Sequence, residues 1–163
     1  MLWVADTGPV LHLAEAGALH LLPLLGKIAV PPAVQDEFGR LRPGESIANF
    51  GTLQVLTATS AVQAVDWCKA GLVDRGEAEA IALARQIHAD YFLTDDAAAR
   101  LLATTLGLRA RGSLGVILWL AGQQCISKKE AAEYLERLAG TSLWISPRVM
   151  IEARTALKEL KVP

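Results

Sequence analysis

Acidic residues follow two short apolar segments whose composition is typical of buried strands. Asp6 comes directly after residues 2–5, and the pair Asp95 and Asp96 comes directly after residues 91–94. Near-continuous apolar character suits strands that are covered on both faces of a parallel sheet. Because the carboxyl ends of parallel strands meet at one edge of the sheet, we expect these carboxylates to lie on the same rim.

Two glutamates are expected to join this rim from neighbouring helices. Glu37 lies about one turn into the helix predicted after the strand at residues 27–30, and Glu77 begins the helix that leads to residues 91–94. Carboxylates gathered in one cleft repel one another and raise one another's pKa, so such a cluster usually implies a counter-charge. Oxygen ligands without Cys or His favour Mg²⁺ or Mn²⁺ over zinc. We therefore predict a Mg²⁺ or Mn²⁺ site, with candidate ligands Asp6, Glu37, Glu77, Asp95 and Asp96.

Each acid also has an ordinary structural explanation. An Asp at a strand end is often the N-cap of the next helix, and of Asp95 and Asp96 one can cap while the other binds. Glu37 has Arg40 three residues on, which is typical of a solvated, ion-paired helix face. Glu77 stands in a first helical turn, where the helix dipole favours any carboxylate. The metal-site hypothesis therefore depends on all of these acids meeting at one rim.

Other catalytic motifs are incomplete in this chain. The Asp-Thr-Gly triplet at residues 6–8 is also found in aspartic proteases, but those are all-β, and here a helical pattern follows. A haloacid-dehalogenase-type phosphatase needs a second Asp where this chain has Gly8. Glycine-rich phosphate-binding loops and the G-x-S-x-G nucleophile elbow are absent. His12, His20 and His88 lie inside helical patterns, and we expect structural roles for them.

Short apolar runs alternate with segments of helical period, which is the pattern of βαβ units. We predict an α/β fold in which helices cover both faces of a central, mostly parallel sheet of four to five strands, a three-layer α/β/α domain. The chain length of 163 residues predicts one domain over residues 1–163, with C-terminal helices at about 127–160 covering the core. The expected strands are 2–5, 27–30, 53–56, 91–94 and 108–110, and the expected helices are 33–38, 77–88, 97–106, 112–123, 127–138 and 147–160.

Net charge, cysteine positions and the length of the apolar stretches exclude several classes of protein. A formal net charge of -1 argues against nucleic-acid binding by bulk positive charge, so any such binding must be local. Cys68 and Cys125 lie far apart without metal-ligand spacing, and reduced thiols are expected. No apolar stretch approaches the roughly 20 residues that a membrane span needs. The apolar run at the N-terminus already ends at Asp6. We therefore expect a cytoplasmic protein without signal peptide, anchor or membrane partner.

Four ordered segments resemble the PIN-domain family, metal-dependent ribonucleases that include the VapC-type toxins of toxin–antitoxin pairs. Residues 4–7 (Val-Ala-Asp-Thr) resemble the family's first strand with its Asp and following hydroxyl residue. Residues 30–37 resemble the P-x-x-V-x-x-E element that places the second acid at Glu37. Residues 76–84 and 93–96 resemble the helix with the third acid and the strand-end T-x-D. Together with Arg100 and a Gly-Ser-Leu-Gly at 112–115, they resemble a prokaryotic branch of PIN-like proteins.

The resemblance implies a metal-dependent endoribonuclease with an RNA substrate, a small antitoxin partner and a homodimer. The T-x-D frame favours Asp96 as the ligand, with Asp95 capping or outside the coordination sphere. The third acid is commonly Asp in the toxins and is Glu77 here, which keeps a catalytically weak or inactive PIN-like binding module as the alternative. The implied catalytic residues are Asp6, Glu37, Glu77 and Asp96; Thr7 and Thr94 would orient them through their hydroxyls, and Arg75 and Arg100 would contact substrate.

Overall fold

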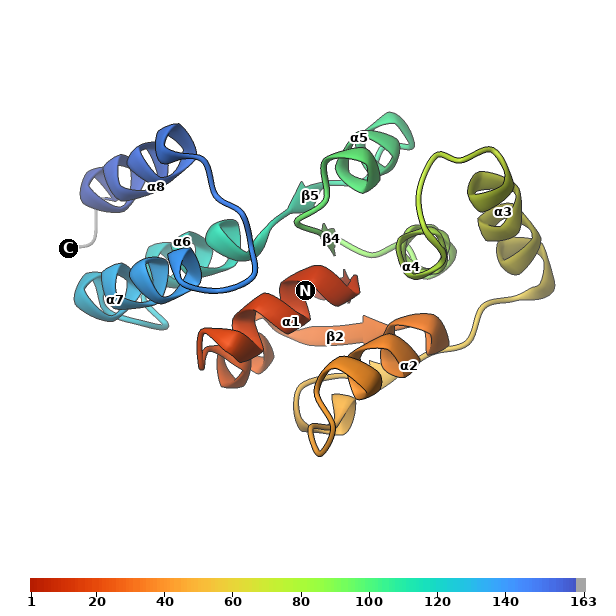
Figure 1. Cartoon of the computed structure of the whole chain (residues 1–163), viewed down its shortest axis with the longest axis horizontal. Coiled ribbons are helices and arrows are strands. Elements are labelled where there is room, and N and C mark those ends of the chain that lie inside the picture. The colour runs from red at the N-terminus through yellow and green to blue at the C-terminus, as the bar shows by residue number, and fades with distance from the viewer. Residues whose placement is uncertain (161–163) are drawn as a thin grey trace.

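A computed structural model describes residues 1–160 and contains one five-stranded, fully parallel sheet with the strand order β3-β2-β1-β4-β5 (Figure 1). The strands are β1 (Leu2–Ala5), β2 (Lys27–Val30), β3 (Thr52–Leu53), β4 (Tyr91–Leu93) and β5 (Ala110–Arg111). Helices flank the sheet on both sides, so the predicted three-layer α/β/α fold is confirmed.

The α-helices are α1 (Thr7–Glu15), α2 (Pro32–Leu41), α3 (Ala58–Lys69), α4 (Arg75–Gln86), α5 (Ala97–Thr105), α6 (Ser113–Gly122), α7 (Lys128–Ala139) and α8 (Pro147–Glu159). Two 3₁₀ segments, Leu19–Leu25 and Ile47–Asn49, precede β2 and β3. Figure 1 shows α6, α7 and α8 grouped at one end of the molecule and α3 at the opposite end. Within residues 1–160, none of the helices is long and apolar enough to cross a membrane.

Strand β1 lies at the centre of the sheet, and the direction of chain winding reverses beside it. The chain runs outward from β1 through β2 to β3, then returns across the sheet to β4 and β5 on the other side. In open parallel sheets, ligands bind at such a switch point, outside the carboxyl ends of the strands. The register sets Ala5 opposite Leu93, and the Asp6 N–H donates to the Leu93 carbonyl at 3.0 Å. Asp6 and the residues after β4 therefore meet at this point.

The buried sheet is held by aromatic packing as well as aliphatic contacts. Trp3 is fully buried in β1, its ring stacks on Tyr91 with centroids 4.3 Å apart, and its indole N–H donates to the Leu25 carbonyl at 3.0 Å. Trp119 of α6 meets Trp3 edge-on at 5.8 Å. These contacts attach α6 to the central strands β1 and β4.

The structure differs from the sequence-based expectation mainly around β3 and α3. The strand expected at 53–56 is only Thr52–Leu53, at the edge of the sheet, and the strand expected at 108–110 is Ala110–Arg111. Helix α3 was not predicted, because it lacks a continuous apolar stripe: only Ala64 is buried, and Val62 and Val65 face outward. The capping box predicted at the start of α7, Ser127 with Glu130, is present.

Candidate functional site

Asp6 is a buried carboxylate at the carboxyl end of β1. Only 5% of its surface is exposed. Its Oδ1 accepts the Thr7 N–H at 2.6 Å, and its Oδ2 accepts the Thr94 hydroxyl at 3.3 Å. The pKa of Asp6 is raised to about 8, chiefly by burial. The negative charges of Glu77 and Asp74 contribute to this rise, and the hydrogen bonds from Thr7 and Thr94 oppose it. A carboxyl group in this state would be stabilised by a nearby cation.

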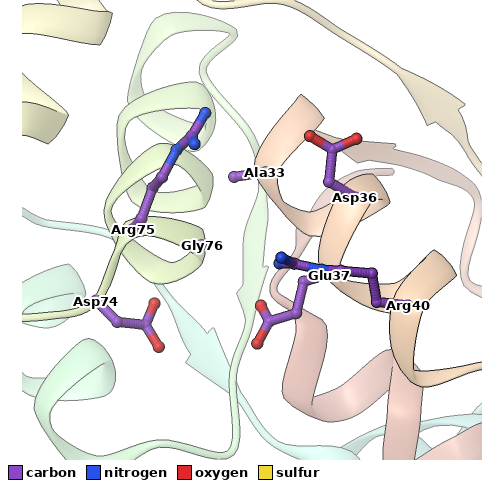
Figure 2. Close-up of a pocket in the computed structure, with 7 residues that line it drawn as sticks. All are labelled: Ala33, Asp36, Glu37, Arg40, Asp74, Arg75 and Gly76. Atoms are coloured by element: carbon purple, nitrogen blue, oxygen red, sulfur yellow. The ribbon is translucent and has the colours of Figure 1, made fainter.

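Thr7 links Asp6 to Glu37. Its backbone contacts Asp6, and its hydroxyl donates to Glu37 Oε2 at 2.7 Å, so one residue holds acids from β1 and α2. Gly76, at the start of α4, allows this arrangement, because a Cβ there would lie 3.0 Å from Glu37 Oε2. Figure 2 shows the carboxylates of Glu37 and Asp74 turned toward one another across a pocket of about 300 Å³.

Glu77 lies in the first turn of α4 and forms a capping box with Asp74. The Glu77 carboxylate accepts the Asp74 N–H, and Asp74 Oδ1 accepts the Glu77 N–H, both at 2.9 Å. Burial raises the pKa of Glu77 to about 7, with added repulsion from Asp74, Asp96 and Glu37. Carboxylates at the end of β1, on α2, at the start of α4 and at the start of α5 therefore repel one another.

Asp95 and Asp96 have different partners. Asp96 is the N-cap of α5, since its Oδ1 accepts the Ala99 N–H at 2.8 Å. Asp95 accepts the Ser113 N–H at 2.7 Å and the Ser113 hydroxyl at 2.5 Å, and it pairs with His12 Nδ1 at 2.7 Å. Of the two, Asp96 therefore caps the helix that follows in sequence, and Asp95 holds the first turn of α6 against α1.

Gly112 is needed for the Asp95 contacts. A Cβ at this position would lie 2.6 Å from Asp95 Oδ1 and 3.0 Å from the Arg100 guanidinium, closer than real Cβ atoms approach in the first case. The backbone of Gly112 has a φ of -103°, so any residue could adopt the conformation and only the space requires glycine. The Gly-Ser pair that resembles a family motif thus provides room and a hydroxyl for Asp95.

Asp6, Glu37, Glu77, Asp95 and Asp96 all line one cleft of about 310 Å³, here called the acidic cleft, as does Asp74. Thr7 and His12 line it as well, and loop residues Leu143 and Trp144 form part of its edge. His12 is the one basic side chain among these lining residues. The predicted convergence of the acids on one rim therefore occurs at the switch point of the sheet.

The donor set fits a hard divalent cation, although no binding group is preassembled. In the described part of the chain, no three His, Cys, Asp or Glu side chains already stand in an arrangement that could hold a metal ion. The lining groups are nevertheless carboxylate oxygens whose mutual repulsion a cation would relieve. The Asp74 N–H holds Glu77 and the Thr7 hydroxyl holds Glu37, each through Oε2. Hydrogen bonds of this kind orient carboxylates for ligation.

The hydroxyl groups of Thr7 and Thr94 contact the acids, as predicted. The two arginines predicted to contact substrate do not line the acidic cleft. Thr94 is fully buried and bridges the site, since its hydroxyl donates to Asp6 and accepts the Asp96 N–H at 3.2 Å. Arg75 is paired with Glu79 at 2.9 Å. Arg100 donates to the Thr94 carbonyl at 2.9 Å and lines a neighbouring hollow.

Sequence reasoning missed four residues at the site. Asp74 was detectable, because Asp-x-x-Glu at 74–77 has the spacing of a capping box. The helical pattern around His12 predicted a structural role for it. In the structure His12 lines the acidic cleft and contacts Asp95, which lies 83 residues further along the chain. Ser113, at the start of α6, contacts Asp95, and Trp144 lines the acidic cleft from the loop before α8. No local sequence pattern predicts the position of either element relative to the site.

Comparison with known families agrees with this architecture. The family model DUF3368, described as a PIN domain, matches residues 2–159. No similar chain was found among curated proteins or among solved structures. The match spans every strand and helix described above and includes all the acids of the cleft. The chain therefore belongs to the PIN-domain family.

Proposed function

We propose that this chain is a Mg²⁺- or Mn²⁺-dependent endoribonuclease that cuts single-stranded RNA and serves as the toxin of a toxin–antitoxin pair. PIN domains are generally nucleases and typically use divalent metal ions. The observation that carries the proposal is the cleft in which Asp6, Glu37, Glu77 and Asp96 face one another with raised pKa values at Asp6 and Glu77. Such a cleft would attract a divalent cation and, through it, a phosphodiester.

The ligands would be Asp6, Glu37, Glu77 and Asp96, with Asp95 outside the coordination sphere because its oxygens are already engaged. A bound divalent ion lowers the pKa of a water molecule and stabilises the charge of a phosphodiester under attack. Thr7 and Thr94 keep Asp6 in place through N–H and O–H donors, which is how neighbouring groups usually orient metal ligands.

A substitution at Asp6 tests the activity. Asp6→Asn keeps the shape and the Oδ1 acceptor but removes the charge, so metal-dependent cleavage of single-stranded RNA should be lost. Asp36→Asn is the matched control, because Asp36 is exposed beside Glu37 and turns away from it (Figure 2). Full cleavage by Asp6→Asn, or equal loss in Asp36→Asn, would refute the assignment. A panel of RNA, DNA and phosphomonoester substrates separates ribonuclease from other phosphoesterase activity.

The toxin role is tested in cells. Induced expression of the wild-type chain should arrest bacterial growth, and expression of Asp6→Asn should not. Co-expression of a small protein from the adjacent reading frame should restore growth and co-purify with the chain. Cleavage in vitro without growth arrest would retain the ribonuclease and exclude the toxin.

The alternative is a PIN-like binding module without strong catalysis. It is favoured by the capping box that holds Glu77 and by the lack of a preassembled metal-binding group among residues 1–160. Calorimetric titration with Mn²⁺ distinguishes the two. Binding that is lost in Asp6→Asn supports the nuclease, whereas no binding at millimolar Mn²⁺ supports the module.

A further inference from the structure

Trp144 is an exposed tryptophan on a well-anchored loop. At 83% exposure it exceeds every other exposed large hydrophobic side chain in the described chain. The loop between α7 and α8 that carries it is tied down, because the Ser142 N–H and hydroxyl each donate to Glu15 Oε2 at 2.8 Å. The Leu143 N–H donates to the Thr141 hydroxyl at 3.2 Å. An aromatic ring held outward on a fixed loop is suited to contact a partner.

The position of Trp144 relates it to the acidic cleft. Trp144 and Leu143 line the acidic cleft, and both also line an adjacent hollow of about 560 Å³. We call this second depression the arginine hollow; its walls include Arg100, Arg111, Leu114, Ile145 and Val149. Asp95 borders both depressions. Trp144 therefore stands at the boundary between the candidate metal site and a hollow of opposite charge.

Two arginines and one carboxylate, Asp95, line the arginine hollow, which leaves an excess of positive charge there. Within residues 1–160, neither Arg100 nor Arg111 forms an ion pair with a carboxylate. The Arg111 guanidinium lies over the Trp119 ring at 4.9 Å and the Tyr91 ring at 5.1 Å, and its buried Nε has no hydrogen-bond partner in this part of the chain. Arg100 is bound to the Thr94 and Ala110 carbonyls, which position it without neutralising it.

An exposed ring beside two unpaired guanidinium groups matches the chemistry of a single-stranded nucleic acid. Bases stack on aromatic side chains, phosphates are held by arginine, and the apolar wall of Leu114 and Ile145 can accept the face of a sugar or base. Bases of a duplex are already stacked inside the helix and cannot reach such a ring. The volume of the hollow lies within the range of small-ligand sites.

We propose that Trp144 stacks on the base of a nucleotide next to the scissile phosphate, with the arginine hollow receiving the phosphate that follows. This inference rests on the proposed RNA substrate and deepens it, because it assigns selection of single strands to one positioning residue. Trp144 holds the strand so that the neighbouring phosphate lies over the acidic cleft.

The binding experiment uses a fluorescein-labelled single-stranded RNA with phosphorothioate linkages, which resist hydrolysis, in the presence of Mg²⁺. Trp144→Ala should weaken binding about 5- to 150-fold, from the roughly 1–3 kcal/mol of one stacked base. Trp144→Phe should restore most of the affinity, whereas Trp144→Leu, which is apolar but lacks an aromatic face, should not. Val62→Ala, an exposed residue on α3, is the control and should bind as the wild type does.

Two further measurements separate stacking from a general structural effect. Binding of a duplex RNA of the same sequence should be unaffected by Trp144→Ala. Arg111→Gln should reduce the slope of log K against log salt by about 1, as expected for one lost phosphate contact. On unmodified RNA, Trp144→Ala should raise KM by about the factor by which it weakens binding, and any fall in kcat should be smaller than that factor.

The outcomes distinguish this inference from the proposed function. Wild-type affinity in Trp144→Ala, equal rescue by Leu and Phe, or equal weakening on duplex RNA would overturn the stacking role even if RNA is cleaved. A change in oligomeric state without a change in RNA affinity would also overturn it and assign the ring to a protein interface. Binding that depends on Trp144 without any cleavage would support stacking and refute the nuclease. No RNA binding by the wild type would refute both.

Discussion

The buried charge of Asp6 should make the metal-free protein less stable as pH rises, and Asp6→Asn should remove that penalty. The folded carboxyl group keeps its proton until a pKa of about 8, while the ordinary value in an unfolded chain is 3.8. Between these values the folded state binds more protons than the unfolded state. By linkage, the free energy of unfolding falls as pH rises through this interval.

The size of the effect follows from the shift. At pH 7 the interval above 3.8 is roughly three pH units, and each unit corresponds to about 1.4 kcal/mol. The upper bound on the gain from Asp6→Asn at pH 7 is therefore about 4 kcal/mol, and the gain should vanish near pH 4. The amide retains the Oδ1 acceptor for the Thr7 N–H, so the local hydrogen bonding that anchors β1 to α1 is preserved.

The assay is urea unfolding of wild type and variant in EDTA at pH 4, 5.5 and 7, with Asp36→Asn as the exposed control. Adding Mg²⁺ at pH 7 should stabilise the wild type more than Asp6→Asn, because a cation that binds the folded state shifts the equilibrium by mass action. A variant no more stable than the wild type at pH 7, or a difference that is the same at pH 4 and pH 7, would refute the assignment of the penalty to burial of this carboxylate.

Two further substitutions test supporting contacts of the site, and a third tests a helical glycine in open space. Thr7→Val removes the hydroxyl bond to Glu37 and should lower Mn²⁺ affinity by about 10- to 100-fold in calorimetry, while Thr7→Ser should not. Gly112→Ala forces a Cβ against Asp95 and should cost about 1–3 kcal/mol of unfolding free energy, with reduced cleavage; an unchanged melting temperature would contradict the contact. Gly39→Ala, in open space within α2, should instead stabilise by about 0.5–1 kcal/mol in the same melts.

Local patterns were sufficient for the strands and helices that carry the acids. The apolar runs before Asp6 and Asp95 predicted β1 and β4 because strands buried on both faces are apolar at every position. Capping chemistry marked the start of α7 and would also have marked α4. Helix α3 gave no such signal, because most of its surface is exposed and its side chains show no period that a core would impose.

The hydrogen bonds around the acids could not be predicted from local sequence patterns. The sequence favoured Asp96 as the ligand but did not show which helix each aspartate serves. That depends on Ser113, whose N–H reaches Asp95 across 18 residues, and on His12, which reaches it across 83. These contacts depend on the packing of α1 against α6, and no spacing along the chain encodes them.

The sequence by itself determined the α/β class, the mostly parallel character of the sheet and the acids at its carboxyl edge, since these follow from composition and periodicity within short windows. Only the tertiary structure decided how the acids are engaged, that Asp74 and His12 join them, and that Trp144 and two arginines border them. The physical reason is that burial, charge repulsion and hydrogen bonding depend on distances in space. Those distances are set when α4, α6 and the loop before α8 pack around the central strands.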